Sequence, residues 1–146
     1  MAQMISIQEG RTCNGRNYSN NKSKEKMLEA RAGIAPLSKI VGMAFGTGGV
    51  NGSDEIVPHS PDQNALHNEA FRKAVDGYEV ISDTCIRYKC TLSETELANT
   101  YISEIGIYDA DGDMVAMKAF MKRARMLIWR LYLSAMILSN AFRYFA

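Results

Sequence analysis

The sequence predicts an α+β protein, built mainly from an antiparallel β-sheet or sandwich with a short N-terminal helix. Two observations favour this class. Short apolar stretches between residues 40 and 120 are bounded by glycine and polar turns, which is typical of antiparallel strands. The chain has no regular strand–helix–strand alternation, so a parallel sheet is not expected. Its 146 residues suffice for one domain with a modest core.

The predicted helix covers residues 23–32. Ser23 is the candidate N-cap residue, because its hydroxyl oxygen can accept a hydrogen bond from a free backbone N–H of the first turn. Gly33 is the predicted stop. Met27 and Leu28 give the segment a thin apolar face, so we expect this helix to dock onto another surface.

Five short strands are expected, and one shows a clear period of two. In residues 85–92, Ile86 and Tyr88 alternate with Arg87 and Lys89, which predicts one buried and one wet face. Residues 64–75 are expected instead to form one or two helical turns. The five strands are predicted at residues 40–45, 78–82, 84–93, 101–109 and 113–120.

Charge divides the chain into regions. Residues 1–20 form a polar arm and residues 21–120 the predicted domain. Residues 1–120 carry 12 basic and 16 acidic side chains, a net charge of −4, whereas residues 121–146 carry five basic side chains and no acid. This basic, apolar tail fits an amphipathic membrane-surface helix or a helix that binds a partner. A second helix is therefore expected in this C-terminal tail.

Cysteine usage and the N-terminus bear on the compartment. Cys13, Cys85 and Cys90 form an odd set without a pairing motif, which favours a reducing site of synthesis over a disulfide framework. The first ten residues lack a charged segment followed by an apolar run, so no secretory signal is expected. The basic residues of the domain are scattered, and no nucleic-acid partner is predicted.

Three aspartates around a glycine, in the stretch DADGD, raise the question of a metal site. An EF-hand loop that started at Asp109 would need glycine at its sixth position and glutamate at its twelfth, and the sequence supplies neither. A tight hairpin turn explains the same residues, with Asp109, Asp111 and Gly112 as its turn-forming members. No metal ligand is therefore assigned.

Two further patterns could indicate functional sites. Glycines in GTGG, at residues 46–49, match neither a phosphate-binding loop nor a dinucleotide fingerprint, so a flexible turn is predicted. His59 and His67 lie near Asp62 and Glu69, but their spacing fits no zinc motif. His59 stands between two prolines in a polar loop and is expected to be solvated. A hydrolase using either histidine is the third functional interpretation, and it would fail if the two were solvated and far apart.

Several stretches, in order, carry a resemblance to a known family. They are KSKEKMLEARAG, IVGMAFGTGGV, PDQNALHNEAFRKAVD and YKCTLSETELANTYISEIGIYDADGDMVAMKAF. Together they resemble the N-terminal region of phage tail-collar fibre proteins over residues 21–120. The combination is more specific than any one stretch.

The resemblance implies a structural component of a phage tail that connects a fibre or collar to the baseplate. It implies a virion location after assembly in the cytoplasm of the bacterial host. It also implies a role in host attachment, other tail or baseplate proteins as partners, and a homo-oligomer, with a trimer favoured. The family brings no catalytic residues, cofactors or metals, so the protein is predicted not to be an enzyme.

The tail departs from the family pattern after Phe120. We therefore hypothesise that residues from about 121 onward are a frame-shifted version of the family's last strand, which the nucleotide sequence can test. An alternative function is a small membrane-associated protein that uses this tail. The residues predicted to bind a partner are Met27, Leu28, Arg31, Trp129, Leu131 and Leu133.

Overall fold

The computed structural model describes residues 3–9, 18–83, 85–93, 95–124 and 133–134. They form one helix and nine strands. The strands are β1 (Gln3–Glu9), β2 (Tyr18–Ser19), β3 (Ile40–Gly46), β4 (Glu69–Ala74), β5 (Gly77–Ser82), β6 (Cys85–Leu92), β7 (Tyr101–Asp109), β8 (Met114–Ala124) and β9 (Leu133–Ser134). The helix is α1 (Asn21–Arg31).

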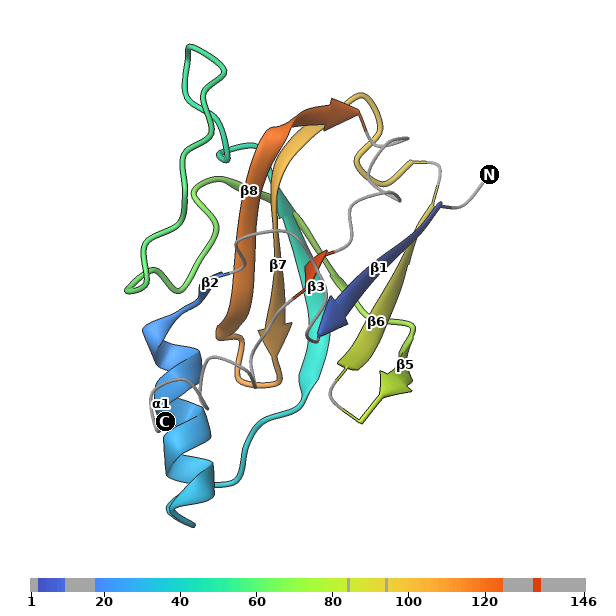
Figure 1. The fold of residues 1–146 in the computed structure, drawn as a ribbon. Coiled ribbons are helices and arrows are strands. Elements are labelled where there is room, and N and C mark those ends of the chain that lie inside the picture. The colour runs from blue at the N-terminus through green and yellow to red at the C-terminus, as the bar shows by residue number, and fades with distance from the viewer. Residues whose placement is uncertain (1–2, 10–17, 84, 94, 125–132, 135–146) are drawn as a thin grey trace.

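The strands form two sheets, which confirms the predicted α+β class. The larger sheet has the order β2-β8-β7-β3-β4, and the smaller has the order β5-β6-β1-β9. Each paired neighbour is antiparallel except β1 and β9, which run parallel. Figure 1 shows α1 beside the larger sheet, near the turn that joins β7 to β8.

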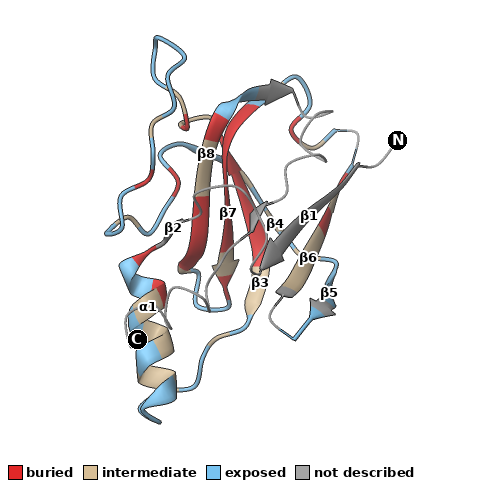
Figure 2. Ribbon diagram, in the orientation of Figure 1, coloured by how far each residue is buried: buried red, intermediate tan, exposed pale blue. Residues whose placement is uncertain are grey.

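The main core lies between the two sheets. Met43 and Phe45 on β3 pack with Ile105 on β7 and with Cys90 and Leu92 on β6, all fully buried. Figure 2 shows the buried residues concentrated on β3, β7 and β8. Burying such side chains contributes roughly 1.5–3 kcal/mol each, so this core is the main source of stability.

The opposite face of the larger sheet has a smaller core of its own. Ala44, Met114 and Met117 lie there together with Leu66, which comes from the long segment between β3 and β4. Strand β3 is therefore buried on both faces, which explains its continuous apolar run. It also means that the β3–β4 segment is part of the packed structure.

Helix α1 begins earlier than predicted. Asn20, not Ser23, is the N-cap residue, and its side-chain oxygen accepts a hydrogen bond from the Ser23 N–H at 2.9 Å. Ser23 lies buried in the first turn, where it cannot serve as the cap. The helix ends in a Schellman motif, with Gly33 at φ +77° and the Ile34 N–H donating to the Glu29 carbonyl oxygen.

The prediction of helical turns in residues 64–75 is wrong, because Glu69–Ala74 form the edge strand β4. Phe71 and Lys73 are half-buried and alternate with exposed neighbours, which is the pattern of a strand with one covered face. Pairing with β3, as between Phe71 and Phe45, supplies the backbone hydrogen bonds and outweighs the helical preference of this polar segment.

Strand β6 of the smaller sheet shows the predicted alternation only towards its end, where Cys90 and Leu92 are fully buried and Thr91 between them is half-buried, whereas residues 86–89 are all half-buried. Cys90 is a free thiol, and burial is the main factor that raises its pKa to about 11. It therefore behaves as a small apolar side chain. Cys13 and the side chain of Cys85 lie outside the described part of the structure.

Strand β8 continues to Ala124, four residues beyond the boundary predicted at Phe120. Most of the predicted tail, including any C-terminal helix, lies outside the described residues. In the part that is described, no helix is both long and apolar enough to cross a membrane.

Candidate docking surface

Residues 47–68, which we call the 47–68 loop, are attached to the larger sheet by one buried carboxylate. Glu104 on β7 has a fully buried side chain. Its Oε1 accepts hydrogen bonds from the backbone N–H groups of Gly48 (3.0 Å) and Asn68 (2.7 Å). Its Oε2 accepts from the His67 N–H (2.9 Å) and His59 Nε2 (2.8 Å). Four donors thus satisfy the two oxygens and offset the cost of burying the charge.

The glycines of the GTGG stretch make room for this attachment, so the prediction of a flexible turn missed their role. A Cβ on Gly46 would lie 2.4 Å from Glu104 Oε1, and one on Gly48 would lie 2.7 Å from the Asn68 backbone nitrogen. A Cβ on Gly49 would lie 1.8 Å from the Ser103 carbonyl oxygen. These glycines are required for close approach of the loop to β7.

The expectation that His59 is solvated is wrong. Its ring is buried against the ring of His67, with centroids 4.6 Å apart and an interplanar angle of 13°. Its Nδ1 is buried without a hydrogen-bond partner in the described structure. His59 therefore holds the Glu104 carboxylate through Nε2 and acts as a structural donor in this contact.

The electrostatics of Glu104 follow from these contacts. Burial alone would raise its pKa, because desolvation disfavours the charged form. The hydrogen bonds from His59 and from three backbone N–H groups favour the carboxylate more strongly. As a result, the pKa of Glu104 lies below its ordinary value, and the attachment is intact while Glu104 is ionised.

The 47–68 loop also attaches to the start of helix α1. The Asn20 amide donates to the Gln63 carbonyl oxygen at 3.0 Å, and the Asn21 N–H donates to the Pro61 carbonyl oxygen at 2.7 Å. The Asn64 side chain accepts from the Met114 N–H at 3.0 Å. One loop thus connects α1 to the middle of β7 and to the start of β8.

The three aspartates of the DADGD stretch lie at the β7–β8 hairpin. Gly112 has φ +86°, and the Asp109 N–H donates to the Asp113 carbonyl oxygen at 2.9 Å. The Asp109 side chain also accepts hydrogen bonds from the Asp111 and Asp113 N–H groups, at 3.0 Å each. The first aspartate therefore shapes the turn through its side chain.

A lysine from helix α1 neutralises this acidic turn. Lys26 Nζ lies 2.7 Å from Asp109, 2.9 Å from Asp111 and 2.5 Å from Asp113. The three carboxylates are close enough together to hold a metal ion, but the ammonium group contacts all of them and supplies the positive charge. This arrangement is a fixed contact between α1 and the hairpin.

Contacts between Lys26 and the acidic turn shift the pKa values of Lys26, Asp111 and Asp113. Partial burial would lower the pKa of Lys26, but hydrogen bonds to Asp109, Asp113 and Asp111 raise it above its ordinary value. The pKa of Asp111 is lowered by its hydrogen bond from Ser38 and then by Lys26. The pKa of Asp113 is lowered chiefly by Lys26. These shifts keep Lys26, Asp111 and Asp113 ionised throughout the neutral range.

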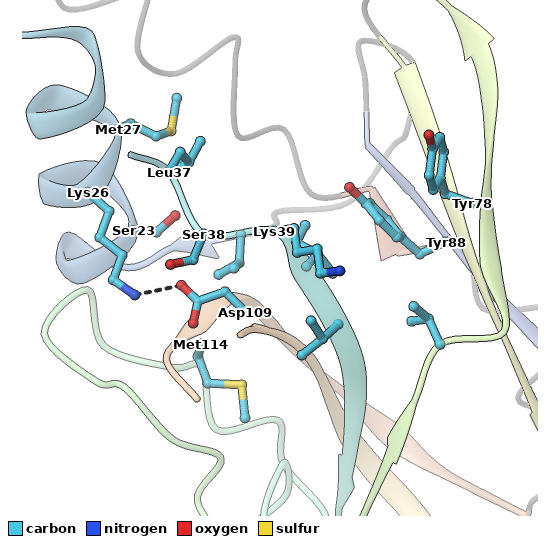
Figure 3. Close-up of a pocket in the computed structure, with 14 residues that line it drawn as sticks. Ser23, Lys26, Met27, Leu37, Ser38, Lys39, Tyr78, Tyr88, Asp109 and Met114 are labelled. Carbon is cyan, nitrogen blue, oxygen red and sulfur yellow. Dashed lines mark hydrogen bonds and ion pairs between the residues drawn. The ribbon is translucent and has the colours of Figure 1, made fainter. Parts of the chain in front are cut away.

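A groove of about 570 Å³ opens between α1 and the smaller sheet. Figure 3 shows Met27 and Leu37 on its α1 side and Tyr78 and Tyr88 on its other side, with Lys39 in between. Leu37 is 55% exposed and Tyr78 is 69% exposed. The groove is therefore apolar at its walls and open to a partner, which is the character of a docking surface.

The predicted partner-binding residues fall in several places. Met27 lines this groove, and Leu28 and Arg31 lie on the exposed side of the same helix. Leu133 lies in β9, where it pairs with Ile7 of β1. Trp129 and Leu131 lie outside the described residues. The structure thus brings one of the six into the groove and leaves two more beside it.

Sequence reasoning missed the residue that organises the loop. Local patterns do not single out Glu104, because its role depends on partners at residues 48, 59, 67 and 68. A signal was available, because an acid within the run ISEIGI must be paired if the strand is buried on both faces. The glycine-rich stretch at residues 46–49 supplies one of the hydrogen-bond donors that pair with this acid.

Comparison with known proteins identifies the family. The model of the phage tail-collar fibre protein N-terminal family matches residues 20–127, about three quarters of the chain. The chain belongs to this family, and the predicted resemblance is confirmed. The match runs seven residues past Phe120, where the sequence resemblance was predicted to stop. Neither the curated proteins nor the solved structures contain a match.

The family defines the class of protein. It is a structural class of phage tail components that associate with other tail proteins, and membership therefore supports a virion tail component. The membrane-associated alternative receives no support from the family. Phage tail-collar fibre proteins are structural proteins, not enzymes.

Proposed function

We propose that this protein connects a tail fibre or collar to the baseplate of a phage or phage-like particle. The observation that carries the proposal is the family match over residues 20–127, which includes α1, both attachments of the 47–68 loop and the β7–β8 hairpin. In this role the protein has no catalytic site and no cofactor. It assembles in the host cytoplasm and takes part in host attachment as a homo-oligomer, with a trimer favoured.

The outer side of α1 is the surface proposed to dock on the baseplate. Leu28 is 51% exposed, Ile34 just beyond the helix is 74% exposed, and Arg31 lies between them in sequence. Lys26 fixes the helix to the hairpin, and Asn20 fixes it to the 47–68 loop. A rigidly held helix that presents apolar and basic side chains is suited to receive another protein, because little order is lost on binding.

Incorporation into particles tests this proposal. Particles are produced with the wild-type chain, with the double variant Leu28→Asp and Arg31→Glu, or with the control variant Asp83→Lys on an exposed turn far along the sequence. The amount of the chain per purified particle is measured by quantitative mass spectrometry. We expect the double variant to fall at least tenfold and the control to match the wild type. Equal incorporation of all three would refute docking through α1.

A further inference from the structure

The smaller sheet combines strands from inside and outside the family domain. Strands β5 and β6 lie within residues 20–127, which match the tail-collar fibre family, whereas β1 and β9 lie outside that range. The order β5-β6-β1-β9 places β1 directly against β6, as Figure 1 shows. The family domain by itself therefore supplies half of this sheet, and β6 would be an edge strand without β1.

The edge of β6 that β1 covers lies alongside the main core. Cys90 and Leu92 on β6 are fully buried in that core. Cys90 has Ile5 as its register partner, and all seven residues of β1 pair with β6 in the same ladder. An uncovered β6 would leave a row of unpaired backbone groups beside the core, which is costly and invites pairing with another chain. This edge is therefore a site that a strand has to fill.

Strand β1 is separate from the domain whose edge it fills. Among the described strands it pairs only with β6 and β9, and neither belongs to the larger sheet. Residues 10–17 join β1 to β2 on the larger sheet and lie outside the described residues. Eight residues can span up to about 29 Å when extended. A connection of this length is sufficient for β1 to reach the β6 edge of a neighbouring copy.

We propose that β1 of one copy pairs with β6 of a second copy, so that residues 3–9 are exchanged between copies. The edge fits this segment, because the whole of β1 pairs there in one continuous register. Exchange keeps every backbone hydrogen bond of the β1–β6 ladder and requires no new surface. Its cost is the association of the copies, which is small where they are held together at high effective concentration. The exchange rests on the self-association in the proposed function and names the strand that produces it.

The donor strand and the acceptor edge are different surfaces, so each copy gives one strand and receives one. Reciprocal exchange closes a pair of copies. Passing β1 to the next copy closes a ring, which includes a ring of three, or continues along a series. In each arrangement the smaller sheets join the copies, and the exposed side of α1 stays available for a baseplate protein.

Two variants of the full chain, each with one new cysteine, distinguish exchange from pairing within a copy. One carries Ser6→Cys and an affinity tag, and the other carries Lys89→Cys, at positions that face each other in the ladder. Opposed residues of antiparallel strands have Cα atoms about 4.5–5.5 Å apart, which a disulfide can bridge. Both variants also carry Cys13→Ser and Cys85→Ser, and the buried Cys90 is retained.

The two variants are co-expressed, purified through the tag and oxidised. Neither can form the link between positions 6 and 89 within one chain, so a covalent dimer with that link reports exchange. The matched control replaces Lys89→Cys by Lys22→Cys, which makes the same substitution at an exposed position of α1. A single chain with both Ser6→Cys and Lys89→Cys checks the register. Non-reducing electrophoresis measures the dimer, mass spectrometry identifies the link, and a thermal melt confirms that each variant is folded.

We expect the mixture of Ser6→Cys and Lys89→Cys to give at least about tenfold more covalent dimer than the control mixture, because the exchanged strands hold the two thiols together. The link between positions 6 and 89 should account for this excess. The chain with both cysteines should form the same link, and the share between copies should rise with protein concentration during refolding.

Two results would overturn the inference. A link that forms within the chain carrying both cysteines, without excess dimer in the mixture, would show that each copy keeps its own β1. Absence of the link from every variant would show that β1 does not fill the β6 edge in solution. Neither result changes the expectation for docking through Leu28 and Arg31, which incorporation into particles tests separately.

Discussion

The larger sheet is attached to other parts of the chain at two places by charged groups of opposite sign. In the middle of β7, the Glu104 carboxylate accepts hydrogen bonds from four donors, three of them backbone N–H groups of the 47–68 loop. At the β7–β8 turn, the Lys26 ammonium group contacts three carboxylates. The first charge is fully buried, whereas the Lys26 side chain is 15% exposed and that of Asp111 is 58% exposed.

This difference in burial indicates which of the two attachments is less tolerant of substitution. Backbone donors cannot change rotamer, and three glycines are needed to bring them to Glu104. Side-chain carboxylates can move, and water can take over part of the solvation of an exposed one. We therefore expect the loss of Glu104 to be more damaging than the loss of Lys26.

The largest effect should come from Glu104→Gln. An amide places an NH₂ group where one oxygen now accepts two hydrogen bonds, so two donors lose their acceptor inside the core. We expect a loss of about 3 kcal/mol in the free energy of unfolding, measured by urea denaturation. The exposed change Glu55→Gln is the matched control and should stay within about 0.5 kcal/mol of the wild type. Equal stability of both variants would mean that the Glu104 network contributes little.

The difference in stability between the wild type and Glu104→Gln should also depend on pH. Because the pKa of Glu104 is lowered by folding, its contribution is full above the unfolded value of about 4.3 and is lost as the pH falls through the folded value. The stability difference between wild type and Glu104→Gln should therefore be constant from pH 7 to pH 5 and shrink below that range. A difference that grows on acidification would reverse the assigned direction of the shift.

Lys26→Met should have a smaller effect, about 2 kcal/mol, because the acidic turn is partly solvated. The substitution keeps the apolar stem of the side chain but leaves three carboxylates to repel one another around the nearly buried Asp109. Hydrogen exchange should show loosening of α1 before the sheet. Lys22→Met, at an exposed position of the same helix, is the control, and protection of α1 equal in both variants would contradict the prediction.

Gly112→Ala should have the smallest effect, about 1 kcal/mol. The site has open space for a methyl group, but φ +86° is a conformation that alanine adopts at a cost. Gly52→Ala is the control, because that glycine also has open space and does not need a positive φ. A thermal melt compares the two, and an identical melting temperature would mean that the hairpin adjusts without strain.

Much of the fold could be predicted from local patterns. The alternation towards the end of β6 and the apolar run of β7 are set by which face meets the core, and this appears directly in the sequence. Strand β4 could not be predicted in this way. It is an edge strand with few buried side chains, and only its pairing with β3 makes it a strand.

The attachments were harder to predict because they join residues far apart in sequence. Asn20 outcompetes Ser23 as the N-cap because its amide also reaches Gln63 in the 47–68 loop. His59 is buried because Glu104, 45 positions later, provides its partner. The spacing of residues along the chain does not indicate such contacts. A polar loop with two prolines was therefore expected to be solvated.

The chain belongs to a family of phage tail proteins, and we propose that it lies at the junction of fibre and baseplate. The most direct measurement is electron cryo-microscopy of purified particles, with the two sheets and α1 fitted as one body. The account predicts several symmetry-related copies at that junction, with the exposed side of α1 against a baseplate protein. Density for the chain elsewhere in the particle, or α1 facing solvent at the junction, would contradict it.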